Sequence, residues 1–392
     1  MKHEHMIYFR VQQVWALFKL CIAYLLSLFY KQKRIWLISE RGVDARDNGY
    51  WLFTFLRKNY PEIEVYYIIS SDSPDYVKLQ SYKANLLPYR SLAHYIMLWR
   101  ASVLISTHIQ GYFPFMGMGL WFRKISGRYN SKCHVSLKHG ITKDHTAYLD
   151  YSNTHLDLLI SGAKPEYDYF LSAYKYPSSV VQLTGFCRFD GLVNTANHRQ
   201  ILLMPTWREW LYKDADFAGS EYAQTYLSLL HNARLHKLLE QNGMDLIFYP
   251  HHEVQKYLTH FKQHYESSHI IIADKEHYDV QNLLRESDVL ITDYSSVYFD
   301  FAYMGKPVIY YLFDFERYRR EHYSDGWYDY SNGLGTITKT ENDCIEAIAQ
   351  VLQKNCEMPE KCRQYVSHLF PYTDQHNCER VYKAICETEK KS

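Results

Sequence analysis

The sequence lacks the short motifs that define several large enzyme classes. No GxxxxGK[ST] stretch is present, which excludes a P-loop nucleotidase. No GxGxxG follows an early apolar run, which argues against a dinucleotide-dependent dehydrogenase. The zinc-protease pattern HExxH and the nucleophile elbow GxSxG are also missing. A catalytic role for these 392 residues must therefore come from another arrangement of polar side chains.

Cysteine is sparse, and charge of either sign is not in excess. The eight cysteines contain no CxxC pair, whereas disulfide scaffolds are Cys-dense and zinc sites need closely spaced ligands. We therefore expect reduced, mostly buried thiols in the cytosol and no metal site. The formal net charge of +1 gives no indication of a nucleic-acid partner.

Long apolar runs are also few, and the longest lies near the N-terminus. Residues 14–30 read "VWALFKLCIAYLLSLFY", with Arg10 before them and Lys31 after them. Seventeen residues are short for a bilayer span of about 20 residues, and no signal-peptide cleavage site follows. Basic residues beside an aromatic face favour a membrane-associated helix over residues 1–34 that lies on the cytoplasmic membrane surface. A true span and a core helix are the alternatives.

What the sequence does contain is an alternation of short apolar runs with helical patterns, beginning at "IWLIS" (35–39). This alternation predicts βαβ units and parallel sheets. The length suits two domains, which we place at residues 35–195 and 196–392. The apolar, glycine-rich stretch 112–122 is expected to be a buried loop or a second membrane-facing patch.

Polar residues follow four of the predicted strands. In open α/β sheets, ligands bind at the carboxyl ends of the strands. The four strand exits carry Lys138-His139, Thr206 with Arg208, His251-His252, and Thr292-Asp293-Tyr294-Ser295-Ser296. Three of these exits can bind an anion, and the fourth supplies a titratable histidine. Ser295 and Ser296 precede a predicted helix, so they either cap it or add hydroxyls to an anion site at its start.

These exits resemble motifs of the CDP-glycerol glycerophosphotransferases of teichoic acid and capsule synthesis. The matching stretches are "HG" at 139–140, "TWR" at 206–208, "YPHHE" at 249–253 and "TDYSSVYFDFAYMGKPVIYY" at 292–311. "LISERGVDARDNGYWLFTFLR" near the N-terminus is similar to members of the family as well. The resemblance implies a GT-B-like fold of two facing Rossmann-type domains, the first for the acceptor and the second for the CDP donor.

The resemblance also implies a role for each site residue. His139 matches the family's HG histidine and is expected to be the general base. Arg208, His251, Ser295 and Ser296 are expected to bind the donor phosphates. The family order is His then Pro, whereas "PHHE" places Pro first, so the choice between His251 and His252 stays open.

Supporting roles are expected for Thr206, Asp293 and Lys143. We expect Asp293 to shape the turn after its strand, because a carboxylate beside a diphosphate repels it unless a metal lies between them. Lys143 follows "HG" in "HGITKDH", where the family often has Thr-Pro before its lysine. No cofactor is required by this scheme, and a divalent cation is left open.

The implied reaction transfers glycerol phosphate, or a related polyol phosphate, from a CDP donor to a lipid-linked glycan or polymer and releases CMP. The expected partners are the CDP-polyol, that acceptor and the membrane surface. Glycerol and ribitol donors are not distinguished, and neither is the oligomeric state. The alternatives are a GT-B glycosyltransferase that uses a nucleotide sugar and a non-catalytic membrane adaptor.

Overall fold

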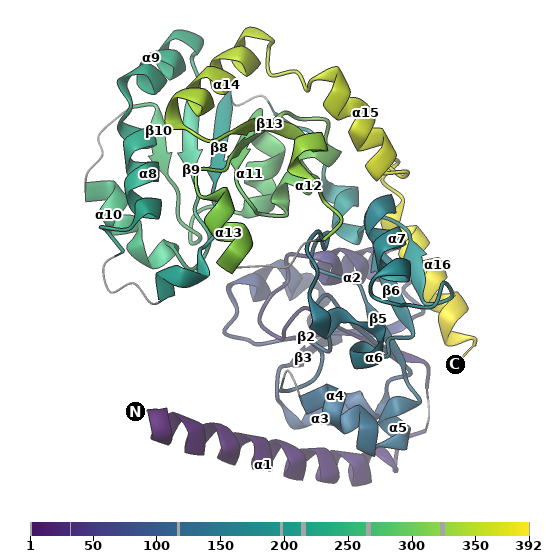
Figure 1. Cartoon of the computed structure of the whole chain (residues 1–392). Helices are drawn as coiled ribbons and strands as arrows, with labels where there is room; N and C mark the ends of the chain where they lie inside the picture. Colours follow the sequence, from purple (N-terminus) through teal and green to yellow (C-terminus); the bar gives the residue numbers. More distant parts are fainter. Residues whose placement is uncertain are drawn as a thin grey trace. The chain divides into compact units, whose positions relative to one another are not determined.

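The chain folds into two compact units, which are described separately (Figure 1). The computed structural model describes residues 2–31, 33–115, 118–196, 199–212, 217–263, 268–321 and 326–391. Unit 1 comprises residues 1–141, 147–190 and 372–392, and unit 2 comprises residues 142–146 and 191–371.

Unit 1 contains a seven-stranded parallel sheet in the order β3-β2-β1-β4-β5-β6-β7. Its strands are β1 (Ile35–Ser39), β2 (Glu64–Ile69), β3 (Leu86–Pro88), β4 (Val103–Ser106), β5 (Cys133–Ser136), β6 (Leu158–Ser161) and β7 (Val181–Leu183). Its helices are α1 (Lys2–Ser27), α2 (Asn48–Asn59), α3 (Leu92–Arg100), α4 (Met118–Ile125), α5 (Gly127–Asn130), α6 (Tyr151–Thr154), α7 (Lys164–Ser172) and α16 (Asn377–Glu389). The strand order changes direction between β1 and β4, and such a switch point is where open α/β sheets bind ligands.

Unit 2 repeats this topology with six parallel strands in the order β10-β9-β8-β11-β12-β13. Its strands are β8 (Gln200–Met204), β9 (Asp245–Phe248), β10 (Ile270–Ile272), β11 (Val289–Thr292), β12 (Val308–Tyr311) and β13 (Gly335–Thr338). Its helices are α8 (Glu221–His231), α9 (Ala233–Asn242), α10 (Leu258–Gln263), α11 (Val280–Glu286), α12 (Val297–Tyr303), α13 (Phe315–Glu321), α14 (Glu341–Gln353) and α15 (Glu360–Leu369). The switch point lies between β8 and β11.

Strands β1, β4, β11 and β12, in the middle of the two sheets, are buried along their whole length. Strands covered on both faces need apolar residues at every position, which is why they form continuous apolar runs in the sequence. The edge strand β13 differs, and sequence reasoning missed it. Thr336 and Ile337 in this edge strand are exposed, so its sequence carries no apolar run.

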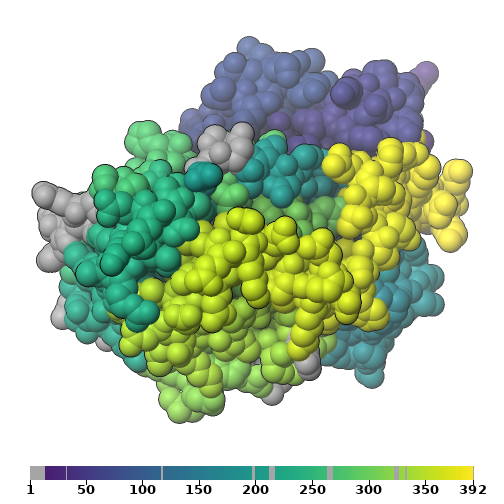
Figure 2. Space-filling view, turned by 90° about the horizontal axis from the view of Figure 1, so that it is seen from above, coloured from purple at the N-terminus to yellow at the C-terminus, as the bar shows by residue number. Residues whose placement is uncertain are grey.

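The C-terminal segment returns to unit 1, which the predicted boundary did not anticipate. Asp190 accepts hydrogen bonds from the backbone N–H groups of Asn377 and Cys378, both at 2.8 Å. Glu389 near the end of α16 pairs with Arg34 at 2.7 Å. Figure 2 shows these C-terminal residues (yellow) beside the teal surface of residues 150–190. The predicted division at 195/196 lies close to the observed 190/191 boundary, but the last helix belongs to the first domain.

The N-terminal helix α1 packs on α3 through a narrow apolar stripe. Ala16, Leu20 and Ala23 are buried in this contact, and Trp99 Nε1 donates a hydrogen bond to the Leu20 carbonyl oxygen at 2.9 Å. Across the described ranges, no helix has both the length and the apolar content that crossing a bilayer would need.

The stretch 112–122 divides into two parts. Tyr112, Phe113 and Phe115 are buried in the unit 1 core, as predicted for a buried loop. Met116 and Gly117 lie outside the described residues. Trp121 is on α4 and is exposed.

Candidate active site

Asp293 organises the switch point of unit 2. It follows β11 directly and is completely buried. Its Oδ1 accepts hydrogen bonds from the backbone N–H groups of Thr206 at 2.8 Å and Tyr294 at 2.6 Å. Its Oδ2 lies 2.8 Å from Nη1 of Arg208 and accepts from the Tyr226 hydroxyl at 3.2 Å. Asp293 therefore links the loop after β8 to the loop after β11, in keeping with the turn-shaping role expected for it.

The guanidinium of Arg208 is completely buried and is bound by protein acceptors. Nε and Nη2 donate to the two carboxylate oxygens of Asp314 at 2.6 and 3.0 Å. Nη1 donates to the Thr206 carbonyl oxygen at 2.8 Å, and the Tyr294 ring centroid lies 4.6 Å from the guanidinium carbon. Burial opposes the charge, but Asp293 and Asp314 raise the pKa of Arg208 well above its ordinary value.

This geometry does not show the phosphate-binding role predicted for Arg208. A guanidinium fork can bind a diphosphate only when its parallel donors are free, and here they bind Asp314. Sequence reasoning missed Asp314, which lies in the stretch "YLFDF" at the end of β12 and resembles no motif. Its position could have identified it, because it follows a buried parallel strand as the other site residues do. Arg208 instead fixes the relative positions of the loops after β8, β11 and β12.

Ser295 and Ser296 lie at the start of α12 and are half-buried. Ser296 is at the N-cap position, but its side chain makes no capping hydrogen bond. The Ser295 hydroxyl lies 3.5 Å from the backbone nitrogen of Val297, at the limit of a hydrogen bond. The two hydroxyls are therefore not accounted for by helix capping. Gly305 follows the C-cap of the same helix in a left-handed conformation, with φ of 74°.

Of the two candidate histidines after β9, His251 is the one packed against the switch-point loop. Its backbone N–H donates to the Pro205 carbonyl oxygen at 3.2 Å, and its side chain is half-buried. His252 is exposed and lies 3.3 Å from Glu253. Burial, followed by the charge of His252, lowers the pKa of His251 to about 4. His251 is therefore neutral at pH 7.

His139 follows β5 in unit 1 on a loop that buried side chains hold in place. Asn48 Nδ2 donates to the Lys138 carbonyl oxygen at 2.7 Å, and Asn48 Oδ1 accepts from the Arg188 backbone N–H at 3.0 Å. Arg188 Nη1 in turn donates to the His139 carbonyl oxygen at 3.1 Å. The rings of His139 and His108 are stacked, with centroids 4.7 Å apart and planes 7° apart.

The electrostatic surroundings of His139 favour a neutral imidazole. Desolvation by the surrounding protein lowers the pKa of His139 well below its usual value, and Lys138, His108 and Arg188 lower it further. The residue is nevertheless exposed, so dense neighbouring protein surrounds the ring without sealing it from solvent. An accessible neutral histidine can accept a proton.

A cavity of about 580 Å³ adjoins His139 within unit 1. It lies at the carboxyl ends of β4 and β5, the edge where ligands bind in this class of sheet. Its lining residues are Thr107, His108, Ile109, Leu120, Trp121, Lys124, Ser136, Lys138, His139, Tyr148, Leu149 and Asn153.

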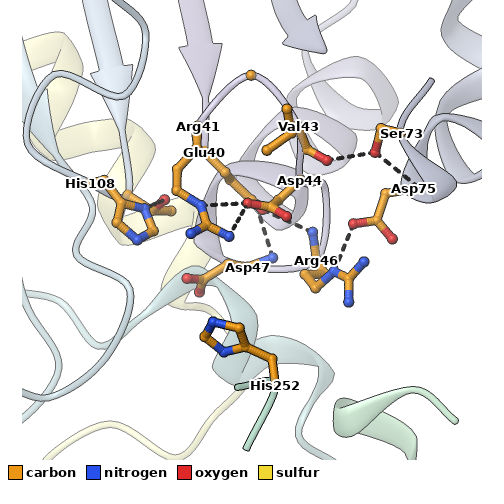
Figure 3. Close-up of polar contacts among 12 residues, drawn as sticks. Glu40, Arg41, Val43, Asp44, Arg46, Asp47, Ser73, Asp75, His108 and His252 are labelled. Atoms are coloured by element: carbon orange, nitrogen blue, oxygen red, sulfur yellow. Dashed lines mark hydrogen bonds and ion pairs between the residues drawn. The ribbon is translucent and has the colours of Figure 1, made fainter. Parts of the chain in front are cut away.

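The loop after β1 contains a second polar cluster that sequence reasoning left without a role (Figure 3). Glu40 is buried and accepts backbone N–H hydrogen bonds from Arg46 at 3.0 Å and from Asp47 and Tyr50 at 2.9 Å. In the same cluster, Arg46 Nε donates a hydrogen bond to the Asp75 carboxylate at 2.7 Å. These bonds fix the start of α2, which carries Asn48. Burial, followed by the charge of Asp47, raises the pKa of Glu40 to about 7.

Lys143 belongs to unit 2, although it follows His139 by only four residues in the chain. It is buried and pairs with Asp144, and the Trp327 backbone N–H donates to the Lys143 carbonyl oxygen at 3.1 Å. Burial lowers the pKa of Lys143, although Asp144 opposes this shift. Lys143 lines a cavity of about 230 Å³ with Tyr294 and other aromatic residues. The structure thus groups it with the loops of the donor-side residues.

The profile of the CDP-glycerol:poly(glycerophosphate) glycerophosphotransferase family matches residues 20–387. The chain belongs to this family. The minor teichoic acid biosynthesis protein GgaB of Bacillus subtilis (strain 168) is 33% identical over 376 residues, which cover 92% of this chain and 40% of GgaB. A teichoic acid poly(glycerol phosphate) polymerase of the same organism is 21% identical, with coverage of 92% of this chain and 49% of the polymerase. This chain therefore spans about half the length of these relatives or less.

Solved structures share the fold. The wall teichoic acid polymerase TagF has a TM-score of 0.67 and 16% identity, with coverage of 100% of this chain and 98% of TagF. A co-structure of S. aureus MnaA with UDP has a TM-score of 0.55 and 15% identity, with coverage of 90% and 95% of the two chains. These likenesses confirm the predicted α/β fold class with two parallel sheets.

Replacing Arg208 with Ala should lower the free energy of unfolding by about 3–5 kcal/mol, because Asp293 and Asp314 would stay buried without their cation. Urea denaturation followed by circular dichroism measures the loss. Arg234→Ala is the control, because Arg234 is exposed and lies 4.0 Å from Glu346, and it should change stability by less than about 0.5 kcal/mol. Normal stability of Arg208→Ala together with lost donor binding would instead support direct phosphate binding.

Glu40 should make the stability of the protein depend on pH. Between pH 4.5, the ordinary pKa, and about 7, the unfolded carboxyl is ionised while the folded one keeps its proton. The unfolded state therefore binds fewer protons, and the free energy of unfolding should fall as pH rises through this range. Glu40→Gln should flatten the slope, and Glu62→Gln, at an exposed position, should not. Urea titrations at several pH values would contradict this if Glu40→Gln kept the full slope.

Proposed function

We propose that this chain transfers glycerol phosphate, or a related polyol phosphate, from a CDP donor to a hydroxyl of a lipid-linked glycan, teichoic acid or capsule polymer, releasing CMP. The observation that carries this proposal is His139, which lies at the end of β5 on the wall of a 580 Å³ cavity in a member of the glycerophosphotransferase family. The names of the relatives support a polyol-phosphate polymer as product.

The proposed chemistry assigns His139 the role of general base. The acceptor hydroxyl loses its proton to the imidazole as its oxygen attacks the phosphorus that carries the glycerol. The bond from this phosphorus to the bridging oxygen of the diphosphate breaks, and CMP leaves with the electron pair. A base must be unprotonated to act, so the lowered pKa of His139 keeps it competent at pH 7.

On the donor side, the proposal uses Ser295, Ser296 and His251 as hydrogen-bonding groups for the diphosphate. The two hydroxyls are not consumed by capping, and His251 is half-buried beside the same switch point. Arg208 and Thr206 position these loops. We place no divalent cation at Asp293, because both of its carboxylate oxygens already receive protein donors.

The direct test is a donor panel. Purified protein is incubated with membrane acceptor and CDP-glycerol, CDP-ribitol or UDP-N-acetylglucosamine, and nucleotide release is followed by chromatography. We expect CMP release from a CDP-polyol and no reaction with the sugar nucleotide. Release of UDP alone would favour the nucleotide-sugar glycosyltransferase, and absence of any release would favour the non-catalytic adaptor.

His139→Ala should reduce CMP release by about 100- to 10,000-fold while leaving CDP-glycerol affinity unchanged, because a general base contributes on this scale and acts on the acceptor. Turnover and calorimetric titration measure the two effects. His155→Ala is the control, because His155 is exposed in the same unit and should keep full turnover. Near-normal turnover of His139→Ala would remove this residue from the chemistry.

We also propose that the protein is peripheral on the cytoplasmic face of the membrane and binds through the membrane helix surface. This surface comprises Val14, Trp15, Phe18, Leu25 and Phe29, which are 54–87% exposed. They lie on α1 or just after it. A bilayer interface would cover them, and Lys19 and Lys31 would favour an anionic leaflet.

The double variant Phe18→Ser, Phe29→Ser should bind phosphatidylserine-containing vesicles at least about tenfold more weakly, because each buried Phe contributes about 1.5–3 kcal/mol. Vesicle co-sedimentation measures the binding, and raised salt should weaken it for the unmodified chain. Val77→Ser provides the control, since Val77 is 68% exposed on a different element, the 3₁₀ helix Pro74–Asn85. Undiminished binding of the double variant would contradict attachment through this surface.

A further inference from the structure

The cavity beside His139 has two chemically different parts. Its polar base comprises Ser136, Lys138 and His139 at the end of β5, with Thr107 and His108 after β4. Its rim is formed by side chains on α4 and near α6, of which Leu120, Trp121, Tyr148 and Leu149 are apolar or aromatic. The general base needs only the hydroxyl of an acceptor, so the rest of the cavity has no role in the proton transfer.

Two polar side chains in the base are buried, and one of them has no hydrogen-bond partner among the described residues. Ser136 is 1% exposed, and its hydroxyl makes no hydrogen bond within the described part of the chain. Lys138 is 3% exposed, and the buried carboxylate of Glu166 lies close enough to stabilise its charge. The Phe170 ring centroid lies 5.6 Å from Nζ. The nearby carboxylate of Glu166 already accepts hydrogen bonds from Ser161 and Gly162.

A buried cation is costly unless anions lie near it. Burial lowers the pKa of Lys138, Glu166 opposes this shift, and a bound anion would oppose it further. No aspartate or glutamate is among the described lining residues, and Lys124 adds a second cation at the rim. The charge of the cavity therefore suits an anionic group next to a hydroxyl that Ser136 or His139 can bind.

The rim indicates what accompanies that anion. Trp121 and Tyr148 are 49% and 60% exposed, and they offer aromatic surface to a ligand that enters the cavity. Aromatic faces pair with flat, partly apolar groups such as the C–H faces of sugar rings, rather than with a flexible three-carbon polyol. A volume of about 580 Å³ falls in the range of sites for ligands larger than one glycerol phosphate.

We propose that this cavity is an acceptor subsite for a phosphorylated sugar ring, with the phosphate at Lys138, a ring hydroxyl at Ser136 and the ring against Trp121 and Tyr148. The acceptor role rests on the proposed function, because it assumes the proposed reaction. The binding of a sugar phosphate in the cavity does not depend on that reaction. It assigns a glycosyl phosphate, rather than a bare polyol phosphate, as the preferred terminal unit of the acceptor.

Binding is tested with three small probes and no donor. N-acetylglucosamine 1-phosphate, N-acetylglucosamine and glycerol 3-phosphate are titrated into the full chain by ligand-observed NMR. The sugar phosphate should bind about tenfold more tightly than either other probe, because only it engages both the cation and the aromatic rim. Equal affinity for sugar phosphate and glycerol 3-phosphate would overturn the assignment of a ring.

Variants then separate the two contributions. Lys138→Met should remove the preference for the phosphorylated sugar, and Trp121→Ala should remove the preference for the ring. Ser136→Ala should weaken sugar-phosphate binding a few-fold without changing thermal stability, since the lost hydroxyl has no protein partner. Lys164→Met is the control, because Lys164 is exposed and pairs with Asp168 on α7. Unchanged sugar-phosphate affinity in both Lys138→Met and Ser136→Ala would overturn the proposal.

Failure of this inference and failure of the proposed function give different results. If no CDP donor is consumed but the probe preferences and their loss in the variants are observed, the subsite stands and the reaction is different. If CMP is released while the three probes bind alike, the reaction stands and the cavity does not select a sugar phosphate. In an active enzyme, Lys138→Met should raise the KM for acceptor about tenfold and leave CDP-glycerol affinity unchanged.

Discussion

The guanidinium of Arg208 lies between two buried carboxylates, and the carboxyl edge of the unit 2 sheet depends on this contact. Asp293 follows β11, Asp314 follows β12, and Arg208 follows β8. These three strands are neighbours in the sheet, so one cation fixes three loops at once. Ser295 and Ser296, whose hydroxyls are candidates for donor binding, lie on the loop after β11. The contacts that fix this loop therefore also fix the positions of the two hydroxyls.

Buried ion pairs of this kind specify a geometry more than they add stability, because desolvation offsets much of the attraction. Removing one partner is nevertheless costly, since the others stay buried and charged. Unit 1 reaches a similar result mainly with neutral groups. Asn48 binds the backbone on both sides of the site, and Glu40 fixes the start of the helix that carries Asn48. In both units, buried side chains therefore hold the site loops in place, by ion pairs in unit 2 and by hydrogen bonds to the backbone in unit 1.

The two candidate sites also differ in how charge is balanced. In unit 2 the buried cation Arg208 is matched by two carboxylates, which leaves the hydroxyls and neutral His251 to contact an anion. In unit 1, the described residues that line the cavity include Lys124 and Lys138 but no carboxylate. Desolvation, followed by the charge of Lys138, keeps His139 neutral, as a base requires, and the two lysines favour an anionic ligand in the cavity. One electrostatic feature therefore bears on both proton transfer and acceptor choice.

The sequence by itself determined most of the strands, the two-domain α/β class and the polar strand exits, because strands covered on both faces must be continuously apolar and end in polar loops. It also located Asp293 as a turn-shaping residue, since that role depends largely on residues close in the chain. The partner of Arg208 was decided only by tertiary structure, because Asp314 lies 106 residues away, in the loop after β12, and β11 separates β12 from β8 in the sheet. The sequence likewise could not show the return of α16 to unit 1, the membership of Lys143 in unit 2 or the lack of a partner for the Ser136 hydroxyl among the described residues. Each depends on which distant segments fold against one another, and no local pattern of residues encodes that pairing.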